Sequence, residues 1–123
     1  MNSTFTNNSA LFGGAVRCTN GCNATFQNSF FSQNIASSGG AIQVEAGSSV
    51  TVNNLKIYNN IAMLNGGAVN VLQNGQLTAN KVLFIGNQAY RGSVINLLGS
   101  MQPQSIKLTN TLFFRNQATQ NTI

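Results

Sequence analysis

Few side chains in this 123-residue chain are suited to acid–base or nucleophilic chemistry. Glu45 is the only acidic residue, and the sequence contains no histidine. Glycoside hydrolysis generally needs two carboxylates, and a serine or cysteine nucleophile needs an activating partner. Histidine would be the usual neutral base and metal ligand. We therefore expect a chain that is not an enzyme and that holds neither a cofactor nor a metal ion.

The two cysteines, Cys18 and Cys22, enclose the short segment Thr19-Asn20-Gly21. A disulfide across this turn is one interpretation, and it would agree with an oxidising compartment. The alternative is that Cys18 is simply a small buried apolar residue. Two cysteines without further ligands make a poor zinc site.

Three asparagines lie in the Asn-x-Ser/Thr pattern that accepts N-linked glycans, namely Asn2, Asn7 and Asn23. Because the chain is rich in asparagine, serine and threonine, about three such sites are expected by chance. They are candidates only in a protein secreted by a eukaryote. Asn23 is the best placed of them, because it falls in an expected turn.

The net charge of +5 reflects scarce acids, since six basic residues face one glutamate. These bases fall at different phases of the repeat described below, so they form no stripe. Nucleic-acid binding proteins concentrate positive charge on one face, and we expect no nucleic-acid partner. No apolar stretch approaches the ~20 residues that a membrane span needs. The first residues show no basic region followed by an apolar run, as a secretory signal would.

Two short motifs alternate along the chain and position these side chains. The first is aromatic-x-x-Asn, and its asparagines recur at intervals of 26, 26, 27 and 29 residues. The second is Gly-Gly-Ala, at residues 13–15, 39–41 and 66–68, with a divergent copy at 91–94. A fixed period of this size marks a solenoid, whose units cannot bury a core alone. The first positions are Phe5, Phe31, Ile57, Phe84 and Phe113, and the asparagines are Asn8, Asn34, Asn60, Asn87 and Asn116.

Apolar and polar residues alternate with period two after each glycine motif, as in Ile42-Gln43-Val44. Such alternation predicts strands with apolar residues inward and polar residues outward. Three short strands and three bends per repeat predict a rung of a parallel β-helix, an all-β fold. Four to five rungs are expected in a single domain covering 1–123. Their approximate bounds are 1–12, 13–38, 39–65, 66–91 and 92–123.

The recurring asparagines are expected to form an amide ladder inside the turn, from Asn8 to Asn116. Asparagine tolerates left-handed backbone angles and bonds nearby backbone groups, which suits a turn position. The glycine pair is expected where the chain bends sharply. These structural roles account for the motifs better than a catalytic role does.

The pairing of Phe-x-x-Asn with Gly-Gly-Ala-Ile resembles the repeats of the polymorphic outer membrane proteins of Chlamydia. The resemblance covers nearly the whole chain, with Ile57 and residues 91–94 as departures. It implies a right-handed β-helix passenger that is secreted, exposed at a cell surface and often adhesive.

Neither end of the chain resembles a polar cap, and natural proteins normally cover open sheet edges. The rung that starts at Phe5 could continue the ladder that ends at Phe113. The sequence therefore predicts an extracellular structural subunit that stacks head to tail with other copies, as a filament or surface stalk. The alternative is an adhesin fragment whose long side, with outward Thr25, Thr51 and Thr78, binds a receptor or glycan.

Overall fold

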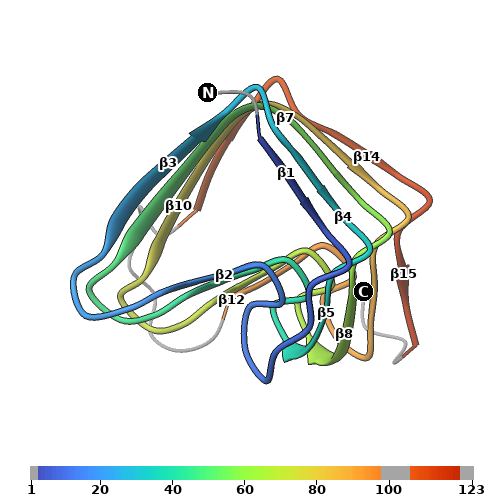
Figure 1. The fold of residues 1–123 in the computed structure, drawn as a ribbon. Coiled ribbons are helices and arrows are strands. Elements are labelled where there is room, and N and C mark those ends of the chain that lie inside the picture. The colour runs from blue at the N-terminus through green and yellow to red at the C-terminus, as the bar shows by residue number, and fades with distance from the viewer. Residues whose placement is uncertain (1–2, 98–105, 120–123) are drawn as a thin grey trace.

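The computed structural model describes residues 3–97 and 106–119 of the chain. In these residues all regular structure is β-strand, and no helix occurs. Figure 1 shows the strands stacked as a coil of roughly triangular outline, and the coil makes about four turns. Neighbouring strands are parallel throughout the three sheets. The predicted all-β, parallel β-solenoid is confirmed.

The strands form three sheets, here called sheets A, B and C. Sheet A contains β1 (Thr4–Thr6), β3 (Asn23–Gln27), β4 (Phe30–Ser32), β7 (Ser49–Tyr58), β10 (Gln76–Ile85), β13 (Ile106–Thr109) and β14 (Leu112–Phe114). Sheet B contains β5 (Ile35–Ser38), β8 (Ile61–Asn65), β11 (Gln88–Ala89) and β15 (Gln117–Ala118). Sheet C contains β2 (Val16–Cys18), β6 (Ile42–Val44), β9 (Val69–Val71) and β12 (Ile95–Leu97).

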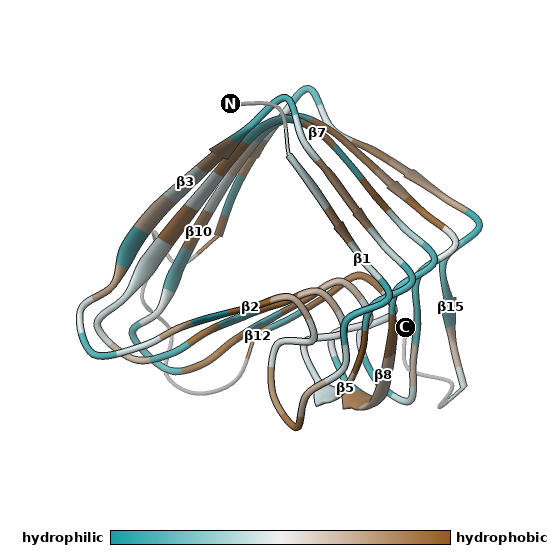
Figure 2. Ribbon diagram, viewed as in Figure 1, coloured by the Kyte–Doolittle hydropathy of each residue, from teal (hydrophilic) through white to brown (hydrophobic). Residues whose placement is uncertain are grey.

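Equivalent residues of successive rungs lie in register on neighbouring strands, so each position of the repeat becomes a rank along the solenoid. The inward ranks fill the core, which is closed most completely in the central rungs. Figure 2 shows the alternation of apolar and polar residues along β3 and β10 that produces this arrangement. The rank of motif first positions consists of Phe5, Phe31, Ile57, Phe84 and Phe113.

Each rung has one more corner than the sequence predicted, and the strands of sheet B were not predicted. Four left-handed residues mark the corners of the rung at 39–65, with φ of 67° at Gly39, 76° at Gly47 and 58° at Asn54 and Asn59. Asn54 bends β7 in its middle, so two predicted strands form one bent strand. The additional strands are those of sheet B. They escaped prediction because, as in Ile35–Ser38, they show little alternation of apolar and polar residues.

The expectation that the ladder asparagine itself takes left-handed angles is wrong. The residue immediately before it does so, as at Asn59 beside Asn60. The ladder side chain must point into the coil, whereas the preceding residue turns the chain and faces solvent. These turning residues are Asn7, Gln33, Asn59, Gly86 and Arg115.

The two glycines of the Gly-Gly-Ala motif have separate roles. Gly39, the first, turns the chain from sheet B to sheet C with a positive φ. Gly40, the second, lies so close to the next rung that a Cβ atom there would collide with the carbonyl of Gly67. The divergent copy keeps the first role, because Gly92 has a φ of 62°.

Candidate functional surfaces

The asparagine ladder runs through the interior at the corner between sheets A and B. The Asn60 side chain makes four hydrogen bonds: its Oδ1 accepts from N and Nδ2 of Asn34 at 3.0 and 2.9 Å. Its Nδ2 donates to the carbonyl of Phe31 at 3.1 Å and to Oδ1 of Asn87 at 3.0 Å. The same pattern recurs at each step from Asn8 to Asn116. Since Asn34, Asn60 and Asn87 are fully buried, the ladder is a structural element.

The bonds between the asparagines have a direction, because each asparagine donates to the asparagine of the next rung and accepts from that of the preceding rung. Within residues 3–97 and 106–119, nothing donates to Oδ1 of Asn8. Likewise, no acceptor among them pairs with the backbone N–H of Asn116. The two ends of the ladder are therefore complementary, with an acceptor at one face and donors at the other.

The C-terminal face of the solenoid contains an apolar hollow. Three inward-facing residues there, Leu97, Leu108 and Phe113, are 37%, 39% and 47% exposed. Together with Ile95, Ile106 and neighbouring residues they line a volume of about 380 Å³. Their counterparts one rung earlier are fully buried. These three side chains are therefore less covered than the equivalent side chains of the preceding rung.

The predicted stacking residues Phe5 and Phe113 lie at opposite ends of one inward rank. Phe5 stacks on Phe31, with ring centroids 4.6 Å apart and planes at 15°. Phe26 meets both rings edge-on, which anchors the N-terminal end of the rank. The sequence identified the rank correctly, although the structure alone shows how unequally its ends are filled.

A disulfide joins Cys18 and Cys22 at the turn between sheets C and A. Cys18 is fully buried in the core at the inward position that the sequence indicated. The Cys18 sulfur is therefore part of the core and also links the two ends of the turn covalently. Neither thiol is available as a nucleophile in this form.

Glu45 lies beside this turn and is held by three hydrogen bonds. Its carboxylate accepts from Nε of Arg17 at 2.6 Å, Nε2 of Gln43 at 3.0 Å and Oγ1 of Thr19 at 3.0 Å. The Arg17 bond, followed by the Gln43 bond, lowers the pKa of Glu45 to about 2. A carboxylate that is ionised and fully engaged at neutral pH is a poor general acid. The bonds from Arg17 and Thr19 connect Glu45 to the preceding rung.

Two polar residues of sheet C that the sequence placed outward are almost inaccessible. Gln43 and Asn70 are 2% and 3% exposed. They form a second amide row, in which Nδ2 of Asn70 donates to Oε1 of Gln43 and Asn96 donates to Asn70. The sequence signal that could have revealed this row is the recurrence of an amide side chain at the same repeat position, at Gln43, Asn70 and Asn96.

The outer face of sheet A carries apolar residues that the sequence reasoning overlooked. Phe30, Leu83 and Leu112 occupy one outward rank and are 46%, 36% and 56% exposed. Lys56 shares their rank, between Phe30 and Leu83. The residue before each motif aromatic was the signal that could have revealed this rank.

The candidate glycosylation sites and the threonine rank lie on the outside. Asn7 and Asn23 are exposed, whereas Asn2 lies outside the described residues. Thr25, Thr51 and Thr78 are in register, and Lys107 continues their rank. This surface is therefore regular from rung to rung.

No membrane-spanning helix and no group of three metal-binding side chains is found in the part of the chain that the structure describes. The fold, its ladders and its open end define a β-solenoid repeat protein. Two of its segments, residues 2–19 and 28–45, match the Chlamydia polymorphic membrane protein repeat. This match confirms the resemblance drawn from the motifs, because each segment contains both motifs in phase. No curated protein and no solved structure matches the chain significantly. The repeat and the fold together indicate a surface protein.

Proposed function

We propose that this chain is a non-enzymatic structural module of the cell exterior that stacks end to end with other copies of itself. The observation that carries the proposal is the apolar hollow at the C-terminal face, around Leu97, Leu108 and Phe113. A further rung set on this face would bury these side chains as the equivalent residues are buried one rung earlier. The disulfide supports an oxidising, extracellular location.

The polarity of the asparagine ladder supports a head-to-tail arrangement. The backbone N–H and Nδ2 of Asn116 would donate to Oδ1 of Asn8 in the next copy, continuing the existing pattern. Head-to-head contact would oppose donor to donor or acceptor to acceptor. A head-to-tail contact that does not close on itself produces a filament.

The expected energies permit such a contact. On the order of ten new backbone and ladder hydrogen bonds would each contribute about 0.5–1.5 kcal/mol. Burial of the exposed apolar surface adds to this at about 25 cal/mol per Å². Association costs roughly 4–15 kcal/mol, so the balance allows stacking without making it irreversible.

Sedimentation velocity over a wide range of concentrations tests the proposal. Phe113→Lys places a charge in the hollow, whereas Phe114→Lys changes a neighbour in β14 of similar exposure that faces outward. We expect association of the wild-type chain and of Phe114→Lys, and a monomer for Phe113→Lys. Circular dichroism verifies that each variant is folded. A wild-type chain that stays monomeric, or equal association of the two variants, would contradict stacking.

A second candidate function is adhesion, supported by the surface-protein repeat and by the regular rank of Thr25, Thr51 and Thr78. A soluble monomer would then bind cells through its long side. Bulky replacements of Thr51 and Thr78 should abolish cell binding while leaving the fold intact. Unchanged binding would remove this rank as the adhesive surface.

A further inference from the structure

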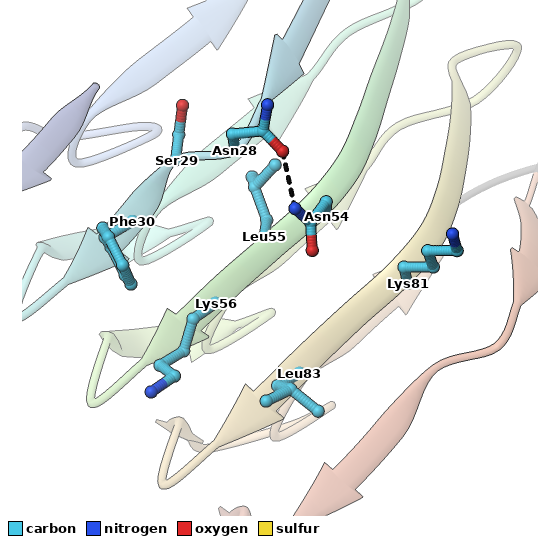
Figure 3. A pocket seen from close by; sticks show the side chains of 8 residues that line it. All are labelled: Asn28, Ser29, Phe30, Asn54, Leu55, Lys56, Lys81 and Leu83. Carbon is cyan, nitrogen blue, oxygen red and sulfur yellow. Dashed lines mark hydrogen bonds between the residues drawn. The ribbon is translucent and has the colours of Figure 1, made fainter. Parts of the chain in front are cut away.

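An open hollow lies on the long side of the solenoid, where sheet A bends, and it is separate from the C-terminal face. Figure 3 shows side chains from β4, β7 and β10 and from the bend before β4 surrounding it. Its volume of about 560 Å³ is within the range of small-ligand sites. The residues used below are Asn28, Phe30, Asn54, Lys56, Lys81 and Leu83.

Three of the side chains that line the hollow are apolar, namely Phe30, Leu55 and Leu83. Phe30 and Leu83 expose apolar surface on either side of Lys56 in their rank, and the buried Leu55 also lines the hollow. Exposed aromatic and aliphatic side chains around a recess are typical of ligand sites. They suit a ligand with a rigid apolar face, such as the C–H face of a sugar ring.

The upper edge offers amide groups that are only half used. Nδ2 of Asn54 donates to Oδ1 of Asn28 at 2.6 Å. Nδ2 of Asn28 and Oδ1 of Asn54 have no partner within residues 3–97 and 106–119. A free donor beside a free acceptor suits hydroxyl groups, because each hydroxyl both donates and accepts.

Two lysines add positive charge that no carboxylate compensates. Lys56 and Lys81 both line the hollow, and Figure 3 shows them on neighbouring strands. The only acidic residue of the chain, Glu45, is engaged by Arg17 beside sheet C. The hollow therefore favours a ligand that carries an anion.

Lys81 is also held in an unusual backbone conformation. Its φ is 58°, at a corner where the other rungs have Asn28, Asn54 and Asn110. Asparagine tolerates this left-handed region better than lysine does. Strain retained at the edge of a recess is a recognised pointer to function.

We propose that this hollow binds an acidic oligosaccharide, a sugar chain that carries carboxylate or sulfate groups. Sugar rings would pack on Phe30 and Leu83, hydroxyls would bond the two asparagines, and the anion would pair with the ammonium group of Lys56 or Lys81. A second copy of the chain is a poor occupant, because its own lysines would repel these. A lipid surface is disfavoured because the apolar side chains line a recess instead of protruding. The site does not depend on end-to-end stacking.

Calorimetric titration tests the site with a hyaluronan hexasaccharide, a heparin hexasaccharide and neutral cellohexaose as probes. We expect one or both charged probes to bind and the neutral one to bind at least about tenfold more weakly. Hyaluronan binding indicates recognition of carboxylate groups, whereas heparin binding without hyaluronan binding indicates recognition of sulfate groups. Failure of both charged probes overturns the proposal, as does binding of phosphatidylserine vesicles without oligosaccharide binding.

Matched variants locate the binding. Lys81→Asn restores the residue type of the other rungs, so it should fold well, and Lys56→Gln removes the second charge. Each should weaken binding of the charged probe about tenfold, whereas Lys107→Gln, elsewhere on sheet A, should leave it unchanged. Equal losses for all three would contradict a defined site. Repeating the titration on Phe113→Lys separates binding from stacking, since that variant leaves the hollow intact.

Discussion

Replacing Asn60 by alanine should destabilise the solenoid strongly, because the side chain is buried and makes four hydrogen bonds. Each bond contributes about 0.5–1.5 kcal/mol net, so the loss lies at about 2–6 kcal/mol. The groups left behind on Phe31, Asn34 and Asn87 are buried, which favours the upper half of that range. Domains of this size are typically stable by only about 5–15 kcal/mol.

Asn8→Ala is the matched control at the exposed end of the same ladder. It removes a single side-chain bond, from Nδ2 of Asn8 to Oδ1 of Asn34, and leaves the backbone N–H of residue 8 in place. We expect a loss of at most about 1.5 kcal/mol. Urea unfolding followed by circular dichroism measures both variants, with the m value checking that the same amount of structure unfolds.

The contrast between the two variants decides the outcome. A loss at Asn60 of several times that at Asn8 agrees with a cooperative buried ladder. Equal losses, or a loss at Asn60 below about 1 kcal/mol, would show that the stacked amides contribute nothing beyond ordinary turn residues. A stabilising role of the asparagine ladder would then be refuted.

Three further predictions concern the turns. Gly40→Ala should prevent close stacking and cost several kcal/mol in urea unfolding, whereas Gly47→Ala, whose Cβ would meet open space, should cost only about 1–2 kcal/mol. Because the pKa of Glu45 is lowered from 4.5 to about 2, the unfolded chain takes up a proton first, so the melting temperature should fall as pH drops from 4.5 to 2. Glu45→Gln should remove that part of the pH dependence, and an unchanged profile would contradict it. Reducing the disulfide should lower stability by about 2 kcal/mol, as expected for so short a loop, and equal melting with and without reductant would argue against this.

The elements that the sequence predicted well are those that repeat in the same phase. Period-two alternation at Ile42-Gln43-Val44, together with the recurring motif aromatics, led directly to the inward ranks. The interval between asparagines gave the rung length, because stacking in register requires equal rung lengths. Local pattern and global fold agree at these positions.

The features that escaped prediction depend on neighbouring rungs. Gln43 and Asn70 alternate like exposed residues, yet amide partners in adjacent rungs help to bury them. The left-handed turn falls on Asn59 instead of Asn60 because the ladder side chain must face inward. The hollow beside Phe30 and Lys81 arises from three rungs and the bend of sheet A, which no single repeat encodes.

End-to-end stacking is tested most directly by fibre diffraction or cryo-electron microscopy of the concentrated wild-type chain. Stacked solenoids should form unbranched fibres with a repeat of about 4.8 Å along the fibre axis, since the strands run across that axis. Phe113→Lys should abolish these fibres and Phe114→Lys should preserve them. Discrete particles at every concentration, or fibres in which the ~4.8 Å spacing is perpendicular to the axis, would contradict stacking.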